Sequence, residues 1–247
     1  MALNQAQIIT VTSVKGGTGK TTLTLCLAGI LSLKKKKTII VDFDMHAGTI
    51  AASLNVPFNK DLYVLTDDIG NNRFGNIEDY IFKYNDFIDV LPAPKDPRNA
   101  YKINSKYVSI ILDYLRFKYD VILIDTNHII DNINLITFDH SDTIIYSVTS
   151  DLMDLKNMKT MLSIYQDMSS FKYVLVLNEA LNRELLTSYD ASTILGVDIK
   201  YVIPKSFYMK NMQKVIQNGE VLTFLPYLQK SKGYKVLENL VNDVLKG

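Results

Sequence analysis

The feature that most constrains this fold is a glycine-rich segment between an apolar run and a stretch of helical spacing. IITVTSV (8–14) leads into KGGTGKTT (15–22), and apolar residues at helical spacing continue to Lys34. Glycines let the backbone turn tightly, and the positive end of the following helix directs its N–H groups to the same place. An apolar strand, such a loop and a helix, in this order, predict a phosphate-binding loop.

The side chains of this loop predict how a nucleotide would be held. Lys20 is expected to reach the β- and γ-phosphates, and the Thr21 hydroxyl is expected to bind Mg²⁺. The residues expected to surround the phosphates are Gly16, Gly17, Thr18, Gly19, Lys20, Thr21 and Thr22. The alternative is a glycine-rich turn with no ligand, which the strand and the helix on either side do not favour.

Short apolar runs alternate with longer stretches of helical spacing along the chain. The predicted strands are 8–14, 38–43, 87–91, 120–125, 143–149 and 173–178. The predicted helices are 22–34, 105–117, 152–168 and 181–195. Because the two kinds of element alternate, we expect an α/β fold with a doubly wound, mostly parallel sheet flanked by helices. No repeat or linker divides the chain, so one domain over 1–247 is expected, with the proline-rich stretch 91–100 as an ordered surface loop.

The composition argues against several classes of protein. A single cysteine, Cys26, rules out an internal disulfide framework, and we expect it to be buried on the first helix. Histidines scattered at positions 46, 128 and 140 do not suit a structural zinc site. The formal net charge of +1 gives no general reason to expect nucleic acid. The sequence has neither a signal peptide nor an apolar segment of about 20 residues, so a cytoplasmic location is expected.

The loop departs from the usual phosphate-binding pattern at its beginning. Val14 stands where the first glycine of that pattern would be, and Lys15 follows it. With this lysine the segment resembles the deviant Walker A ATPases of the ParA/MinD family, whose hallmark is KGG-x-GK-[ST]. The resemblance implies ATP and Mg²⁺ as ligands. It also implies that Lys15 crosses a dimer interface to the partner subunit's nucleotide, as an arginine finger does; the alternative is a solvated surface lysine.

Acidic residues follow two of the predicted strands. Asp42 and Asp44 come at the carboxyl end of 38–43, where ligands bind in doubly wound sheets. The resemblance implies that Asp44 belongs to switch I and orients the attacking water, while Asp42 supports the magnesium shell or the loop geometry. The resemblance also implies that Asp125 begins switch II, and this residue is expected to hold Mg²⁺, the alternative being an ordinary strand-end turn residue. Asn127 stands where family members usually have proline, a departure that bears on how switch II moves.

Several segments resemble the CpaE/TadZ branch of the family, which helps to place pilus machinery at cell poles. The sequence around switch I, DFDMHAGTIAASL, has the pattern D-x-D-x-x-x-G-x-x-A-x-x-L of that branch. Further matches are LPAPKDP (91–97), TSDLMDLKNMK (149–159) and IPKS (203–206). Asn178 matches a family asparagine that contacts adenine, and Pro204 lies in the corresponding base-side loop. The alternative for Asn178 is a strand-end asparagine that makes a turn.

Two surface features have a plain and a functional interpretation. Lys34–Lys37 is favoured as a solvated helix end, although four lysines could also touch DNA or an acidic membrane. The stretch 232–247 has an apolar face at helical spacing, but its polar face is not rich in lysine or arginine. We therefore expect it to pack against the domain core rather than to bind a membrane. His46 and His128 fall on the two switch segments and are weak candidates for tuning them.

The resemblance implies a homodimer that closes face to face around two ATP·Mg²⁺ and hydrolyses ATP slowly, as a timer. A protein partner is expected to stimulate hydrolysis. Three functions remain open: an ATPase that positions a membrane-associated, secretion or pilus apparatus, a ParA-like DNA-partition ATPase, and a non-hydrolysing ATP-dependent dimeric scaffold. The switch I text favours the first, with a partner recruiting the cytoplasmic protein to the membrane or pole, and the near-neutral charge disfavours DNA.

Overall fold

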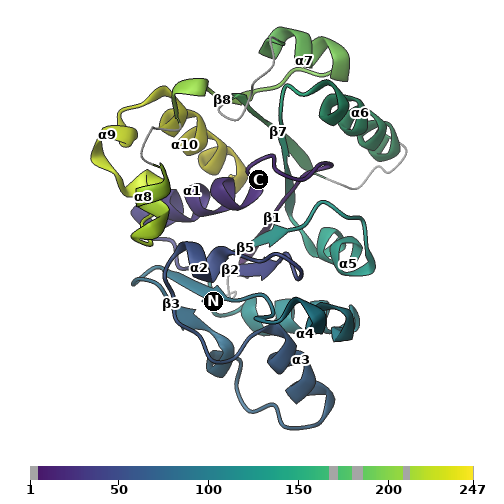
Figure 1. Ribbon diagram of the computed structural model, residues 1–247, viewed down its shortest axis with the longest axis vertical. Coiled ribbons are helices and arrows are strands. Elements are labelled where there is room, and N and C mark those ends of the chain that lie inside the picture. Colours follow the sequence, from purple (N-terminus) through teal and green to yellow (C-terminus); the bar gives the residue numbers. More distant parts are fainter. Residues whose placement is uncertain (1–4, 167–171, 180–185, 208–211, 247) are drawn as a thin grey trace.

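A central sheet of eight strands runs through the molecule (Figure 1). The computed structural model describes residues 5–166, 172–179, 186–207 and 212–246. The strands are β1 (Gln7–Thr12), β2 (Thr38–Phe43), β3 (Phe82–Lys83), β4 (Ile88–Leu91), β5 (Val121–Thr126), β6 (Thr143–Val148), β7 (Tyr173–Asn178) and β8 (Tyr201–Ile203). Their order across the sheet is β3-β4-β2-β5-β1-β6-β7-β8. Every neighbouring pair is parallel except β3 with β4, so the predicted doubly wound, mostly parallel sheet is confirmed.

The strands form where apolar residues follow one another without a break. Every residue of β2, β5 and β6 is buried, as strands covered on both faces require. The six predicted strands are confirmed, with ends that differ by no more than two residues. β3 and β8 were not predicted, because two or three residues at the edges of a sheet carry too short an apolar pattern to be recognised.

Helices cover both faces of the sheet, as Figure 1 shows edge-on. The α-helices are α1 (Lys20–Leu33), α2 (Ile50–Ser53), α3 (Leu62–Gly70), α4 (Lys106–Leu115), α5 (Asn132–His140), α6 (Leu152–Gln166), α7 (Ser188–Leu195), α8 (Met212–Gln217), α9 (Pro226–Gln229) and α10 (Lys232–Leu245). Short 3-10 helices are η1 (Ile77–Tyr80), η2 (Pro97–Lys102), η4 (Lys205–Phe207) and η5 (Leu222–Phe224). α1 and α10 pack in one apolar cluster, α3 and α4 in a second, and α6 and α7 in a third.

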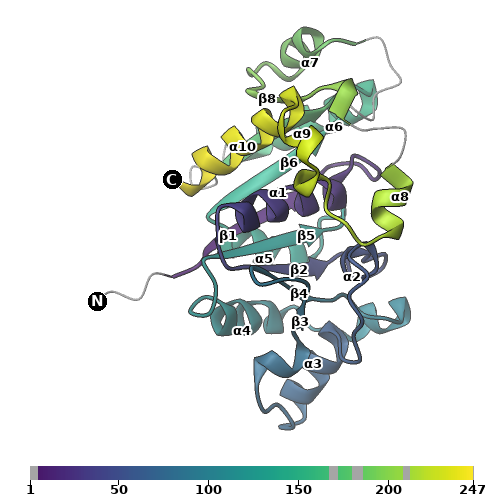
Figure 2. The ribbon, with the colours of Figure 1, turned by 90° about the vertical axis from the view of Figure 1, so that its left-hand side faces the viewer.

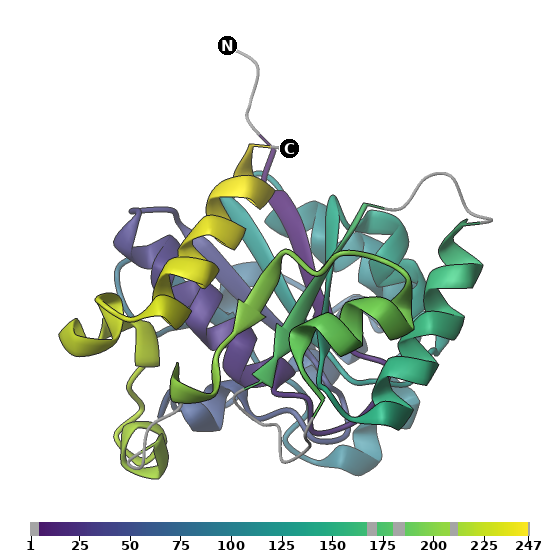
Figure 3. The same cartoon turned by 90° about the horizontal axis from the view of Figure 1, so that it is seen from above.

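The C-terminal helix α10 belongs to the core, as expected from the character of its polar face. Leu237 and Leu240 are fully buried, and α10 contacts both α1 and β8. The Gln7 amide at the start of β1 donates to the carbonyl of Val244 at 2.5 Å. Figures 2 and 3 show α10 lying along α1, with its end close to the start of β1. The apolar face of this helix is therefore occupied by the protein itself.

The predicted helices differ from the observed ones at their ends. The predicted helix 181–195 begins at Ser188, because Thr187 and Asp190 form a reciprocal capping box that sets its first turn. Residues 181–185 lie outside the described part, as do the last two residues of the predicted helix 152–168. α1 begins at Lys20, two residues before the predicted start. The stretch 91–100 is ordered, and η2 begins inside it at Pro97 with Asp96 as its cap.

None of the helices in the described ranges is both long enough and apolar enough to cross a bilayer.

Candidate nucleotide-binding site

The loop between β1 and α1 has the backbone that a phosphate site needs. Gly17 and Gly19 adopt positive φ values of 76° and 87°, a region that favours glycine. Gly19 is also the N-cap of α1, and no side chain caps that end of the helix. The first N–H groups of α1 therefore point out of the helix with no side-chain acceptor, which is the arrangement that binds an anion.

Two buried side chains support the loop from neighbouring strands. The carbonyl of Thr18 accepts hydrogen bonds from the Ser147 hydroxyl at 2.9 Å and from the Asn178 amide at 3.0 Å. Ser147 lies near the carboxyl end of β6, Asn178 is the last residue of β7, and both are buried. In this structure Asn178 fixes the phosphate loop, so its predicted contact with adenine stays a prediction. The role of Ser147 was missed, because nothing in the local sequence points to a partner so far away along the chain.

Asp125 lies at the end of β5 with two threonines of α1 against it. The Thr21 hydroxyl donates to Oδ2 at 2.7 Å, and the Thr24 hydroxyl donates to Oδ1 at 3.2 Å. Asp125 is 1% exposed, and this burial raises its pKa to about 7. The structure therefore brings together the predicted magnesium residues Thr21 and Asp125. Thr24 was missed, although its spacing of three from Thr21 places both on one face of α1.

Asp42 stands beside Asp125 in the sheet, since the two residues are paired in register between β2 and β5. Its Oδ1 accepts from the backbone N–H of Asp44 at 3.2 Å, and its Oδ2 accepts from that of Ile50 at 3.1 Å. Burial and the neighbouring Asp125 raise the pKa of Asp42 well above its usual value. Both oxygens hold the segment that follows β2, which favours the loop-geometry alternative for Asp42.

Asp44 lies on that segment, at the start of the predicted switch I. Its Oδ1 accepts from the backbone N–H of Ala47 at 3.2 Å, so the carboxylate closes a short turn. The His46 ring packs against that of Tyr101 in η2, with centroids 4.9 Å apart. His46 therefore contacts a part of the chain that the sequence did not connect with switch I.

Lys20 is buried at the first position of α1 and is surrounded by acidic groups. Burial lowers its pKa, while the carboxylates of Asp125, Asp44 and Asp154 act in the opposite direction. The loop lysine and two of the three predicted acidic site residues, Asp44 and Asp125, therefore share one electrostatic environment. Asp154, fully buried on α6, was not predicted as a member of it.

Lys15 lies at the more exposed side of the loop and is held by α6. Its ammonium lies 2.9 Å from Oδ1 of Asp151, and the two side chains are 42% and 35% exposed. The same Asp151 oxygen accepts from the backbone N–H of Asp154 at 2.9 Å, at the first turn of α6. Lys15 is thus tied to a helix end in this structure, and its predicted contact with a second subunit remains a prediction.

The predicted switch II begins with a turn that the Asn127 side chain builds. Its Oδ1 accepts from the backbone N–H of Ile129 and from the Asn134 amide, both at 2.8 Å. The Asn134 amide also donates to the carbonyl of Ile129 at 2.6 Å. Where the family usually has proline, a buried pair of asparagines therefore fixes the turn by hydrogen bonds. A Cβ atom built on Gly16 would lie 3.4 Å from the His128 ring, so this turn packs directly on the phosphate loop.

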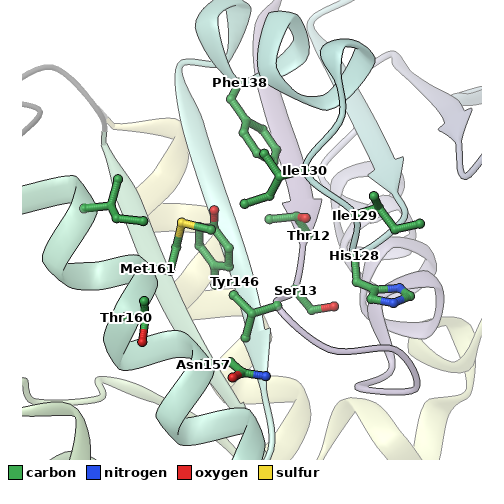
Figure 4. Close-up of a pocket in the computed structure, with 12 residues that line it drawn as sticks. Thr12, Ser13, His128, Ile129, Ile130, Phe138, Tyr146, Asn157, Thr160 and Met161 are labelled. Carbon is green, nitrogen blue, oxygen red and sulfur yellow. The ribbon is translucent and has the colours of Figure 1, made fainter.

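An apolar pocket of about 270 Å³ opens beside the loop (Figure 4). Thr12 and Ser13 form its floor, Ile129 and Ile130 of switch II lie on one side, and Met161 of α6 lies on the other. Ile129 and Ile130 are 52% and 54% exposed. The phosphate loop, switch II and α6 thus share an exposed apolar surface.

The remaining predicted residues have structural environments of their own. Cys26 is buried in α1, and this burial raises the pKa of its thiol to about 12. The carbonyl of Pro204 accepts from the N–H of Phe207 at 2.9 Å and starts η4, beyond the end of β8. Lys34 lies 3.9 Å from Glu238, and Lys200 lies 2.6 Å from Asp243. Within the described residues, no three histidine, cysteine or acidic side chains gather as a metal site would need.

Comparison with known sequences identifies relatives of this chain. A family model described as an AAA domain matches residues 6–182. An uncharacterized ATP-binding protein of Methanocaldococcus jannaschii is 31% identical over 116 residues, which are 46% of this chain and 41% of that protein. The sporulation initiation inhibitor protein Soj of Bacillus subtilis is 25% identical over 252 residues, 96% of this chain and 98% of Soj. The match thus covers less than half of the archaeal protein and nearly all of Soj.

Solved structures with the same fold cover almost the whole chain. A ParA family ATPase from Chlorobium tepidum superposes with a TM-score of 0.82 at 20% identity, over 96% of this chain and 98% of that one. The septum site-determining protein MinD from Pyrococcus horikoshii, complexed with Mg-ADP, gives 0.78 at 23% identity, over 97% of this chain and 96% of that one. At these identities the likeness shows the fold.

Proposed function

The chain belongs to the ParA/MinD family of P-loop ATPases, and from this membership we propose that it is a dimerisation switch driven by ATP binding and hydrolysis. The observation that carries the proposal is the group formed by Lys20, Thr21 and Asp125 under a loop with two positive-φ glycines. A buried lysine and a threonine–carboxylate pair beside an uncapped helix end suit a nucleoside triphosphate with its magnesium ion.

The described residues fit ATP·Mg²⁺ by the chemistry of their donors. Lys20 and the N–H groups of the loop, Gly16 to Thr22, would hold the phosphates, and Thr21 with Asp125 would hold Mg²⁺, to which Asp42 would contribute through the loop it fixes. The buried Thr18 hydroxyl has no hydrogen-bond partner in the described structure, as expected of a group that awaits a ligand. ATP would supply the phosphoryl group, and Mg²⁺ would neutralise its charge. A MinD relative was solved with Mg-ADP, which supports this pair of ligands in the family.

Asp44 is proposed to orient the attacking water. It follows β2 directly, and within the described residues its carboxylate accepts one hydrogen bond, from the N–H of Ala47, so a modest change of switch I would free both oxygens for a water molecule. Its carboxylate shares the electrostatic environment of Lys20. On the base side, Asn178 and Pro204 are proposed to face adenine, which would require the Asn178 amide to serve both the loop and the base.

Lys15 is proposed to act across a homodimer interface, on the nucleotide of the partner subunit. It reaches α6 from the more exposed side of the loop, where its ion pair with Asp151 contributes little to stability and can be exchanged for another anion. The apolar pocket between switch II and α6 lies on the same side and would be covered when two copies meet. Slow hydrolysis, stimulated by a protein partner, would then reopen the dimer.

The cargo proposed for this switch is a membrane-associated, secretion or pilus apparatus, to which a partner would recruit the cytoplasmic protein. The sequence around switch I, which resembles the CpaE/TadZ branch, supports this choice. A direct membrane role for α10 is not supported, because its apolar face is packed in the core. A DNA-partition role is also less favoured, because Lys34 and Lys200 lie against Glu238 and Asp243 of α10 and do not form an unpaired basic surface.

The test is the oligomeric state by light scattering with ADP and with ATP, alongside phosphate release. We expect an ATP-dependent dimer that Lys15→Ala abolishes and Asp44→Ala traps, and that Lys235→Ala leaves unchanged because Lys235 is exposed on α10. A monomer under every condition, with turnover indifferent to Lys15, would refute the switch. An ATP-dependent dimer without turnover would instead identify the non-hydrolysing scaffold.

A further inference from the structure

A second cavity, with a polar lining, lies far from the phosphate loop. It has a volume of about 350 Å³ and is formed by α3, the end of η2 and the first turn of α4. None of its lining residues belongs to the phosphate loop, to either switch or to α6. Figures 1 and 2 both show α3 beside α4 at the β3 end of the sheet, away from α1.

Two lysines on its wall are associated with aromatic rings. The Lys102 ammonium lies 5.3 Å from the centre of the Tyr63 ring, and the Lys106 ammonium lies 5.0 Å from that of Tyr107. Within the described residues, neither ammonium has a carboxylate at ion-pair distance. A cation over a ring keeps its charge and its N–H donors directed away from the ring. The cavity therefore carries two positive charges, and the Lys102 ammonium keeps donors beyond the one that it gives to Oδ1 of Asn99 at 2.9 Å.

The acidic residue that lines the cavity is already engaged. Asp67 pairs with the Arg73 guanidinium through one oxygen and accepts from the Asn71 amide at 3.1 Å through the other. Arg73, which does not line the cavity, also pairs with Asp68 at 2.9 Å, so its one positive charge is shared between two carboxylates. The lining itself holds two lysines and one carboxylate, so its net charge is positive.

The cavity also offers hydroxyl donors. No hydrogen bond to the hydroxyls of Tyr63 and Tyr107 is found in the described part of the chain. A Cβ atom on Gly70 would lie 2.6 Å from the Tyr107 oxygen, so glycine at the end of α3 is what lets this hydroxyl come so close. Two ammonium groups and two hydroxyls around one space form a set of donors suited to an anion with several oxygens.

We propose that this cavity binds a phosphate-bearing small molecule at a site separate from the nucleotide site. Phosphate groups match the donor set, because they carry up to two negative charges and several acceptor oxygens. The volume admits a diphosphate or a phosphorylated metabolite, and the rings of Tyr63 and Tyr107 supply apolar surface for the rest of such a molecule. This inference does not depend on the proposed switch.

The test is isothermal titration calorimetry with inorganic phosphate and with pyrophosphate, using full-length protein that carries Lys20→Ala so that the phosphate loop is impaired. We expect saturable binding of one equivalent, weakened about tenfold or more by Lys102→Ala with Lys106→Ala, since each variant removes a charged donor. The matched control is Lys95→Ala with Lys118→Ala, which removes the same charge outside the cavity.

The outcomes are distinct. Binding lost in the Lys102/Lys106 variant and kept in the Lys95/Lys118 variant supports the site, and the stronger of the two probes indicates the size of the ligand. Absence of saturable binding overturns it, as does equal weakening by both pairs, which would indicate a general charge effect. Circular dichroism of each variant checks that the fold is retained.

Discussion

Replacing Asp125 with asparagine is expected to stabilise the nucleotide-free protein, and to do so more as the pH rises. Burial raises the pKa of Asp125 to about 7, above its ordinary value of 3.8. Between these values the folded protein holds a proton that the unfolded chain releases, so the free energy of unfolding falls as pH rises and stays low above about pH 7. Because Asp125 also raises the pKa of the neighbouring Asp42, the substitution removes the repulsion between the two carboxyls as well, which acts in the same direction.

The magnitude follows from the pH range that the folded pKa covers. About two pH units separate pH 5 from the folded pKa, so the gain from Asp125→Asn should grow by about 3 kcal/mol between pH 5 and pH 8. Asparagine offers one acceptor oxygen in place of two to the hydroxyls of Thr21 and Thr24, which costs about 1 kcal/mol at either pH. The quantity to measure is therefore the gain in the free energy of unfolding at pH 8 minus the gain at pH 5.

Urea unfolding at about pH 5 and pH 8, without nucleotide or metal, measures this difference. The control is Asp139→Asn, an exposed carboxylate on α5, which should show no such growth. A gain from Asp125→Asn that is equal at both pH values, or a loss of stability at pH 8, would refute the reasoning. In the presence of ATP and Mg²⁺ the unsubstituted protein should become more stable than the Asp125→Asn variant. The reason is that the carboxylate expected to hold Mg²⁺ is present only in the unsubstituted protein, which would therefore gain stability from the ligand.

Three further outcomes are expected. Gly29→Ala should lower the free energy of unfolding by about 1–3 kcal/mol despite the helix preference of alanine, since its Cβ would lie 2.1 Å from the Thr223 hydroxyl; a raised melting temperature would contradict this. Asn127→Ala should cost about 2 kcal/mol in denaturant unfolding, because the Ile129 N–H loses its acceptor, and an unchanged midpoint would count against the turn. The single thiol, Cys26, should react with iodoacetamide only as the protein unfolds, because it is buried with a pKa raised to about 12; rapid labelling of native protein by mass spectrometry would disprove its burial.

The elements that the sequence predicts well are those whose signal is local. β2 and β5 are continuous apolar runs, and the phosphate loop depends on glycines next to one another in the chain. The start of α7 also has a local signal, the capping residues Thr187 and Asp190, but the prediction placed the start at an earlier apolar residue. Local patterns were thus enough to predict most strands of the sheet and the phosphate loop.

The parts that escaped prediction depend on contacts between distant segments. Asn178 and Ser147 donate to the carbonyl of Thr18, which lies well over a hundred residues earlier, and no pattern in a short window reports such a partner. For Asp42 the sequence left the magnesium shell and the loop geometry as alternatives, because it showed only that this residue stands at a strand end. Its bonds to the backbone of Asp44 and Ile50 become apparent once the chain has turned back after β2.

The hydrogen bond between Gln7 and the carbonyl of Val244 also bears on how the protein can be labelled. Gln5 and Lys246 line one cavity of about 380 Å³ at the end of the sheet where β1 starts, while the phosphate loop lies where β1 ends. A fluorophore at either position would therefore stand across the sheet from the nucleotide and from the expected subunit interface. A donor and an acceptor dye on this pair would report the release of α10 from β1 without disturbing the loop.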